Sequence, residues 1–253
     1  MWHERETARE WDTEGSPELP TRAPQQEILL ALLRGARVGE SGVLDLGVGS
    51  GLVAEAVLDA LPEASLVGID FSEPMLELAR ARLDRFGPRV QLVRHDLAEV
   101  AELALPAAPY AAAFSVQTLH HLSNPQKKRA IAWSADIVEP GGPIVIVDRV
   151  VIPESLFHQW AAVWRRIDSA TPATYAEYEK QLADGGDRPA TLDDHLSWFR
   201  SAGLAAMCMH AYGNRVVVAG RKPNRVKPDE RRPCERSPRE PRRYHVRPPS
   251  APA

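Results

Sequence analysis

Short apolar runs alternate along this chain with longer segments of helical periodicity. Five runs have the length and composition of buried strands: residues 43–46, 66–70, 90–95, 112–116 and 143–148. Helices are predicted before and between them, over residues 24–34, over residues 52–58, and from Ser72 to Gly87. Strands that alternate with helices predict an α/β fold around a mostly parallel sheet.

The pattern changes after the fifth strand, where helices follow one another without a strand between them. The remaining elements are predicted to be three helices and two strands: residues 154–167, 174–183, 191–203, 204–211 and 214–220. The first two helices form an insert of about residues 154–185. The two strands can pair with each other at the edge of the sheet, so a single domain is expected over residues 1–222.

The first strand ends in a glycine-rich turn, G-x-G-x-G, made by Gly47, Gly49 and Gly51. A strand, a tight turn and a helix start form the place where an α/β protein holds a cofactor, although such turns also serve plain strand-to-helix packing. A dinucleotide fingerprint needs G-x-G-x-x-G, and Leu52 occupies its last place, so the spacing disfavours NAD. The second strand ends in Asp70, where an acid that binds ribose is expected.

The next strand ends add further motifs: Asp96-Leu97 after the third strand, and Leu119-His120-His121-Leu122 after the fourth. Pro140-Gly141-Gly142 then leads into the fifth strand. With these ordered motifs, residues 20–222 resemble the class I S-adenosylmethionine-dependent methyltransferases. The resemblance implies a Rossmann-like doubly wound sheet, mostly parallel with an antiparallel C-terminal strand, and S-adenosyl-L-methionine as the cofactor.

The resemblance also implies a cofactor site of ten residues: Asp45, Gly47, Gly49, Gly51, Asp70, Phe71, Asp96, Leu97, Ser115 and Val116. In the family, such positions place Asp45 and the glycines at the methionine part, Asp70 at the ribose and Asp96 at the adenine. Two residues depart from the family pattern. Ala111 stands where an acid is usual, and Gln117 stands where smaller residues are common.

Methyl transfer from a sulfonium requires mainly an aligned nucleophile, so a base is optional. His120 and His121 follow the fourth strand, at the carboxyl end of the sheet where ligands bind. We predict that His120 is the base and that His121 contacts the substrate, while the alternative that both satisfy local hydrogen bonds stays open. No metal site is predicted, because His120, Asp148 and His195 are scattered along the chain.

In the family, the helical insert lies over the pocket that receives the methyl acceptor. Trp160, Trp164 and Arg165 of this insert are therefore predicted to bind the acceptor, and Arg165, Arg166 or Arg188 could pair with an acceptor carboxylate. The alternative is an aromatic stripe that only docks on the core. The fourth strand also lacks the Asn/Asp-Pro-Pro-aromatic element of amino-group nucleic-acid methyltransferases. A small-molecule acceptor is therefore predicted, with its O, N or C nucleophile left open.

Residues 223–253 differ in composition from the rest of the chain. They hold eight prolines and eight arginines and few large apolar side chains, which predicts a disordered basic tail. Nine lysines and arginines oppose four acidic residues there, a net charge of +5, so residues 1–222 carry −8 within the total of −3. A net-negative folded region repels phosphates, which disfavours nucleic acid as a partner.

The chain contains no apolar run near the roughly 18 residues of a membrane span, and its charged N-terminus lacks the apolar core of a signal peptide. Cys208 and Cys234 are its two cysteines, so no disulfide framework is predicted. A cytoplasmic protein without a membrane partner is expected, and its oligomeric state stays open.

Three functional hypotheses follow. The first is a small-molecule methyltransferase that works by in-line displacement. The second is a methyltransferase of RNA or protein that docks its acceptor through the basic tail. The third is a regulatory protein that binds S-adenosylmethionine without turnover, which is favoured by Ala111 and by the lack of an assured base. Formation of S-adenosylhomocysteine from a metabolite pool separates the enzymes from the regulatory protein.

Overall fold

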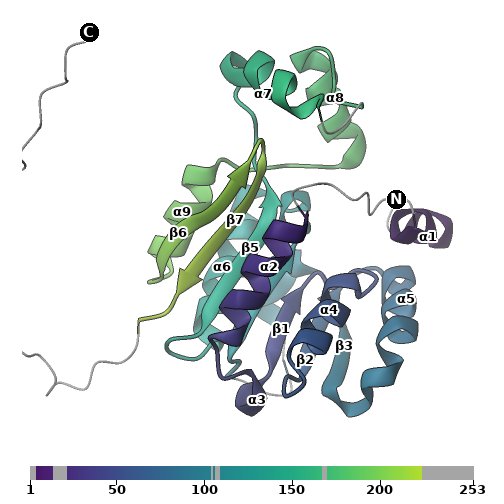
Figure 1. Ribbon diagram of the computed structural model, residues 1–253, viewed down its shortest axis with the longest axis vertical. Helices are drawn as coiled ribbons and strands as arrows, with labels where there is room; N and C mark the ends of the chain where they lie inside the picture. Colours follow the sequence, from purple (N-terminus) through teal and green to yellow (C-terminus); the bar gives the residue numbers. More distant parts are fainter. Residues whose placement is uncertain (1–3, 14–21, 104, 106–108, 167–169, 224–253) are drawn as a thin grey trace, which may run out of the picture.

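The computed structural model describes residues 4–13, 22–103, 105, 109–166 and 170–223 (Figure 1). The predicted disordered tail lies outside these residues, apart from its first residue. The chain folds into an α/β structure whose elements follow the order expected from the hydrophobic pattern.

Seven strands form one sheet: β1 Val43–Leu46, β2 Leu66–Asp70, β3 Val90–Arg94, β4 Ala112–Val116, β5 Pro143–Arg149, β6 Ala205–Tyr212 and β7 Arg215–Arg221. Their order is β3-β2-β1-β4-β5-β7-β6. β1 to β5 pair in parallel, and β7 runs antiparallel to both of its neighbours. The expected doubly wound sheet with an antiparallel C-terminal strand is therefore confirmed.

Nine α-helices are described: α1 Arg5–Thr13, α2 Arg22–Arg34, α3 Val38–Ser41, α4 Leu52–Ala60, α5 Glu73–Leu83, α6 Asn124–Ile137, α7 Phe157–Trp164, α8 Tyr175–Gly185 and α9 Leu192–Ser201. Four 3₁₀ segments accompany them: η1 Asp84–Arg89, η2 Leu97–Glu102, η3 Leu119–His121 and η4 Glu154–Leu156. The hydrophobic pattern did not predict α1, α3 or α6. The sequence of α1, RETAREWDT, is largely polar and lacks the repeated apolar positions of a buried helix face.

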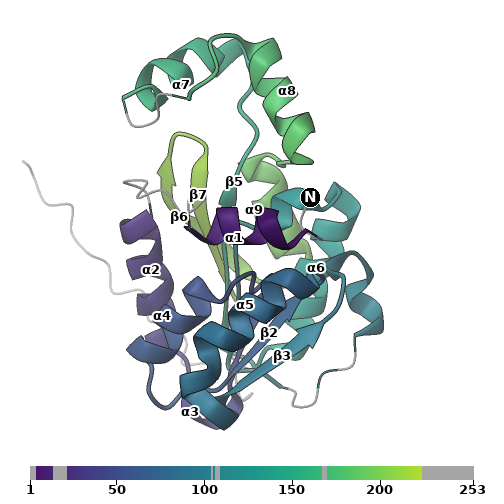
Figure 2. The same cartoon turned by 90° about the vertical axis from the view of Figure 1, so that its right-hand side faces the viewer.

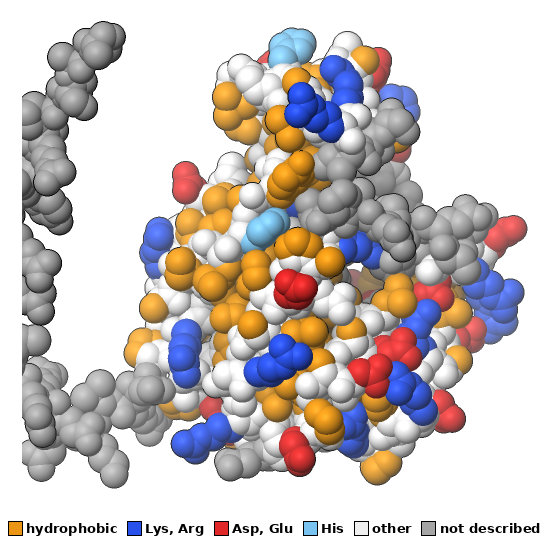
Figure 3. Space-filling view, in the orientation of Figure 1, with side chains coloured by type: hydrophobic (Ala, Val, Ile, Leu, Met, Phe, Trp, Pro, Cys, Tyr) orange, Lys and Arg blue, Asp and Glu red, His pale blue; other side chains and the backbone are white. Residues whose placement is uncertain are grey.

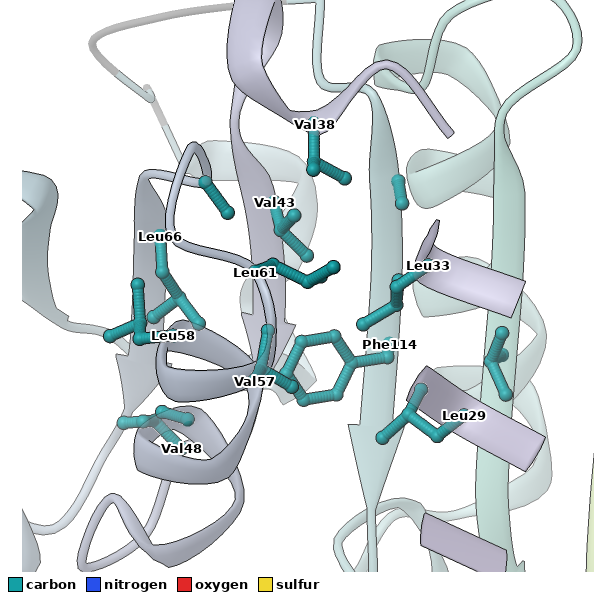
Figure 4. Close-up of a cluster of buried hydrophobic side chains, with 14 of the residues drawn as sticks. Leu29, Leu33, Val38, Val43, Val48, Val57, Leu58, Leu61, Leu66 and Phe114 are labelled. Carbon is teal, nitrogen blue, oxygen red and sulfur yellow. The ribbon is translucent and has the colours of Figure 1, made fainter. Parts of the chain in front are cut away.

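Helices cover both faces of the sheet, with α2 and α4 in front of it and α6 behind it in Figure 1. Successive residues of a strand point to opposite faces, so Val43 and Phe114 join the core under α2 and α4, whereas Leu44 joins the core under α6 and α9. Figure 4 shows the first core, where the ring of Phe114 lies between Val57 of α4 and Leu29 of α2.

The helical insert has a small core of its own. Ile152, Phe157, Ala161 and Tyr178 are buried together, with Trp160 packed against them. Figures 1 and 2 both show α7 and α8 beyond the ends of the sheet strands, apart from the helices that cover its faces. Trp164 of α7 nevertheless contacts the β6–β7 hairpin, where its ring lies 6.1 Å from that of Tyr212 and beneath the Arg215 guanidinium.

The surface over α4 and α5 mixes acidic and basic side chains, as the lower right of Figure 3 shows. Arg85 pairs there with Asp59 at 2.6 Å, and Arg80 pairs with Glu73 at 2.7 Å. Exposed pairs of this kind contribute little to stability, because water screens them. Within the described part of the chain, no helix has both the length and the apolar character needed to cross a membrane.

Candidate active site

A cavity of about 770 Å³ lies at the carboxyl ends of the central strands. The strand order reverses between β1 and β4, and ligands of doubly wound sheets bind at such a switch point. The turn after β1, the ends of β2, β4 and β5, the start of α2 and the segment after α8 all contribute lining residues. Pockets that hold small molecules typically measure about 300–1,000 Å³.

The glycine turn forms one wall of this cavity through Gly47 and Gly49. Gly49 has φ +55°, and a Cβ atom built on it would meet nothing within 4 Å, so its backbone is open to a ligand. A Cβ atom on Gly47 would instead meet the Thr118 side chain at 2.2 Å, so this glycine permits contact between two loops. Gly51 packs against Leu83 of α5 and does not line the cavity.

Asp70, at the end of β2, connects the turn to the next strand. Its Oδ2 accepts a hydrogen bond from the Gly49 N–H at 2.9 Å, and its Oδ1 accepts one from the Ser72 N–H at 2.9 Å. Burial raises the pKa of Asp70, and these backbone hydrogen bonds oppose that rise. The carboxylate lines the cavity and has further lone pairs for a ligand hydroxyl.

Asp45 is the most unusual acid of the site. It is 2 % exposed and lines the cavity. Burial and the nearby charge of Asp70 raise the pKa of Asp45 well above its usual range. Burial penalises the ionised carboxylate, and a cationic ligand group beside it would stabilise that charged form.

The other residues predicted to hold the cofactor divide into two groups. Phe71, Asp96, Leu97 and Val116 line the cavity. Ser115 does not, because its hydroxyl is buried and donates to the Leu46 carbonyl at 2.8 Å, which is a contact inside the sheet. The structure therefore places Ser115 and Gly51 outside the cavity wall.

Asp148 of β5 holds His120 in place through two contacts. The Nδ1 atom of His120 lies 2.5 Å from Oδ1 of Asp148, and the His120 backbone N–H donates to Oδ2 of the same carboxylate at 2.9 Å. Burial raises the pKa of Asp148, but the charge and hydrogen bond of His120 outweigh this and hold it well below its usual range. An ionised Asp148 accepts the Nδ1 proton and leaves Nε2 as the nitrogen that can bind another proton.

Asp187 approaches the same histidines from the opposite side. Its Oδ1 lies 3.5 Å from Nε2 of His120 and 3.3 Å from Nδ1 of His121, and its Oδ2 pairs with the guanidinium of Arg149. Burial and the neighbouring charge of His120 lower the pKa of His121 to about 4. The side chains of His120, His121 and Asp187 offer ligand atoms within 4.8 Å of one another, residue types that also bind metal ions.

The sequence analysis did not predict Asp187 as a site residue. It follows Gly185 and Gly186, which end α8, and only the return of the chain from the insert brings it to β5. Lys127 of α6 holds this return segment, because its buried ammonium donates to the carbonyls of Leu122, at 2.5 Å, and of Arg188. The Arg188 N–H in turn donates to the His120 carbonyl at 2.6 Å.

The aromatic residues predicted to bind the acceptor lie elsewhere. Trp160 and Trp164 stack with 5.9 Å between ring centroids and line a second cavity of about 110 Å³. Arg165 lines neither cavity and donates to the carbonyls of Pro172 and Ala173, while Arg188 does line the large one. Trp160 packs against the insert's own core, whereas Trp164 lies against Tyr212 with 6.1 Å between ring centroids, and neither ring lines the large cavity.

Several other lining residues of the large cavity carried no signal in the sequence: Arg22, Gln25, Arg149, Asp187 and Arg215. They come from α2, from β5 and β7, and from the loop after α8. Each occupies a position in its own element where a polar residue is ordinary. Only the packing of those elements brings them together.

Known proteins share both the sequence pattern and the fold. Residues 43–142 match a family described as a methyltransferase domain. The chain is 30% identical over 217 residues to the ubiquinone biosynthesis O-methyltransferase of Saccharophagus degradans, covering 83% of each protein. It is 26% identical over 212 residues to the 27-O-demethylrifamycin SV methyltransferase of Amycolatopsis mediterranei, covering 80% of this chain and 75% of the relative.

The fold is similar to that of a solved O-methyltransferase family protein from Burkholderia thailandensis, with a TM-score of 0.61 and 19% identity. That likeness covers 81% of this chain and 57% of the Burkholderia protein. One assignment follows from the sheet topology, from the cavity at its switch point, and from the similarity to known methyltransferases over most of the chain. The chain belongs to the class I S-adenosylmethionine-dependent methyltransferases.

Proposed function

We propose that this enzyme transfers the methyl group of S-adenosylmethionine to an oxygen of a small molecule, with His120 as the general base. The observation that carries the proposal is the buried pair of His120 and Asp148 in the wall of a cavity that also holds the glycine turn. A base is useful when the acceptor is a hydroxyl, because the proton must leave as the new carbon–oxygen bond forms.

The end of the cavity beside β1 and β2 suits S-adenosylmethionine. Gly49 leaves its backbone open, Asp70 offers acceptors for ribose hydroxyls, and the buried carboxylate of Asp45 suits a cationic group. The cofactor supplies a methyl group that its sulfonium already activates, so the protein has mainly to align the acceptor oxygen.

His120 would accept the proton of the acceptor hydroxyl at Nε2. The resulting imidazolium would lie between two carboxylates, Asp148 at Nδ1 and Asp187 near Nε2, and their charge would stabilise it. Asp148 would also keep the Nδ1–H tautomer, as the carboxylate does in other His–Asp pairs. Asp187 belongs to the segment that closes the insert, so the insert would contribute to the site through this carboxylate.

The relatives support an oxygen acceptor. The Saccharophagus protein is named as an O-methyltransferase of ubiquinone biosynthesis, and the Amycolatopsis protein as a methyltransferase of 27-O-demethylrifamycin SV. Both names refer to a methyl group on oxygen, and the cavity of about 770 Å³ has room for a cofactor and a small acceptor together.

The test uses purified protein, S-adenosylmethionine with an isotopically labelled methyl group, and a pool of hydroxylated metabolites. We expect S-adenosylhomocysteine to form together with a labelled product whose methyl is attached to oxygen, as shown by the product's NMR spectrum. His120→Ala should reduce the rate by about 10²–10⁴-fold while leaving S-adenosylhomocysteine affinity unchanged. A labelled N-methyl or C-methyl product, or full activity of His120→Ala, would refute the proposed chemistry.

A further inference from the structure

Two arginines lie directly opposite each other at the end of the cavity near the insert. Arg149 of β5 and Arg215 of β7 are paired in the antiparallel register, and both line the large cavity. Like charges in opposed positions of neighbouring strands destabilise a sheet. Burial and the charge of Arg149 lower the pKa of Arg215 to about 10, so it remains a cation at neutral pH.

The protein supplies few partners for these two cations. Arg149 donates to one carboxylate, that of Asp187, and Arg215 donates to the side-chain oxygen of Gln117 at 3.3 Å. The Arg215 guanidinium also lies 5.7 Å from the ring centroid of Trp164, and the charges of Asp148 and Asp187 favour its cationic form. A guanidinium carries five N–H donors, so most of the donors of the pair are unused. Among the described residues, the buried Nε atoms of both arginines have no hydrogen-bond partner.

Gln117 contributes a second observation at the same place. It is the non-glycine residue with a positive φ, +52°, in the described part of the chain. A side chain in this backbone region is strained, and such strain persists where function requires a particular orientation. Gln117 lines the cavity, and its backbone turn directs its amide toward Arg215.

The cavity therefore has two ends of opposite character. Asp45, Asp70 and Asp96 lie at the cofactor end, whereas Arg149 and Arg215 lie at the far end with Arg188. Asp187 is the carboxylate at the far end that pairs with Arg149, so positive charge remains in excess there. An anionic group on the acceptor would satisfy the unused donors and orient the rest of the molecule toward His120.

We propose that the methyl acceptor carries a carboxylate, which binds between the guanidinium groups of Arg149 and Arg215 beside Gln117. This inference rests on the proposed function in one respect, because it treats the bound molecule as the methyl acceptor. The anion site itself is formed by the residues at the far end of the cavity. The sequence suggested Arg165, Arg166 or Arg188 as partners of an acceptor carboxylate, and of these three only Arg188 lines the large cavity. Arg165 lies outside the cavity and hydrogen-bonds within its own insert.

Calorimetry with two matched probes tests the site. Salicylate carries a carboxylate, and salicylamide replaces it with a neutral amide of the same shape. We titrate each into the free protein and into the protein saturated with S-adenosylhomocysteine, at constant ionic strength. Salicylate should bind about tenfold more tightly than salicylamide, which is the smallest gain expected for a hydrogen bond between charged groups.

Variants on one strand provide the control. Arg215→Gln should remove the preference for salicylate and leave salicylamide and S-adenosylhomocysteine binding unchanged, and Arg215→Lys should restore part of it. Arg221→Gln alters an arginine at the other end of β7, outside the cavity, and should keep the preference. Equal binding of the two probes, or equal effects of Arg215→Gln and Arg221→Gln, would overturn the anion site.

Binding and turnover separate the two proposals. If salicylate binds as expected but no hydroxylated compound is methylated, the anion site stands and the proposed function fails. If neutral hydroxyl compounds are methylated by wild type and by Arg215→Gln at equal rates while their carboxylate analogues are not, the methyl transfer stands and the anion site fails.

Discussion

Asp148 binds His120 twice, through the imidazole Nδ1 at 2.5 Å and through the backbone N–H at 2.9 Å. One carboxylate thus fixes both the ring and the chain direction of the residue that we propose as the base. This carboxylate fixes η3 to β5, and the Arg188 N–H, which donates to the His120 carbonyl at 2.6 Å, adds a contact from the segment that follows the insert.

Asp148→Asn tests this relationship. The amide cannot stabilise an imidazolium, and it can hold the wrong tautomer, so kcat should fall by about 10²–10⁴-fold with little change in KM. Steady-state kinetics with the identified acceptor measure the effect. Asp136→Asn, an exposed acid of α6, is the matched control and should leave kcat unchanged. Equal rates of wild type and Asp148→Asn would exclude a role of the carboxylate in proton transfer.

The lowered pKa of His121 predicts how the stability of the folded protein depends on pH. The pKa of His121 falls from 6.5 to about 4 on folding, so the unfolded chain binds the extra proton between these values. Its contribution to stability is therefore complete above pH 6.5 and is lost as the pH falls toward 4, by up to about 3 kcal/mol. Urea unfolding of wild type and His121→Gln should show a smaller loss in the variant over this window. Parallel pH profiles would contradict the assignment.

A larger side chain at Gly49 should prevent cofactor binding. A branched side chain would enter the open space of the cavity wall, so Gly49→Val should abolish S-adenosylhomocysteine binding in calorimetry. The control is Gly203→Val, because Gly203 also has a positive φ, +77°, and open surroundings, but it lies outside the cavity. Both variants carry the backbone strain, and only the first should lose the ligand. Similar affinities in the two variants would move the cofactor away from this turn.

Metal removal tests the group formed by His120, His121 and Asp187. Asp187 already pairs with Arg149, and the guanidinium charge opposes a cation beside that carboxylate. We therefore expect that dialysis against EDTA leaves kcat unchanged and that added Zn²⁺ does not raise it. Activity that is lost in EDTA and restored by a divalent cation would show that these three side chains hold a metal.

A truncated chain that ends at Lys222 tests the division proposed at that residue. β7 ends at Arg221, and the Lys222 ammonium still donates to the carbonyls of Ala135 at 2.8 Å and Val138 at 3.3 Å. The shortened protein should therefore melt like the full chain and methylate a small acceptor at the same rate. If it kept cofactor affinity but lost turnover, the tail would be an acceptor-docking segment, and the macromolecular hypothesis would replace ours.

The cofactor end of the cavity was accessible from the sequence because its signals are local. A buried strand followed by Gly49, or a strand that ends in Asp70, places a residue at the carboxyl edge of the sheet whatever the rest of the chain does. The same reasoning was less reliable for Ser115, because successive side chains of a strand point to opposite faces of the sheet. The Ser115 hydroxyl donates to the Leu46 carbonyl of the neighbouring strand and does not line the cavity.

The sequence by itself determined the strand order along the chain, most of the helices, the glycine turn, and the presence of His120 after β4, because these depend on periodicity and on neighbouring residues. Only the tertiary structure decided that Asp187 returns from the insert to His120, and that Arg149 and Arg215 face each other. It also decided that Trp160 faces the insert's own core. Such contacts join residues far apart in the chain, and their geometry is set by how whole elements pack rather than by any local pattern.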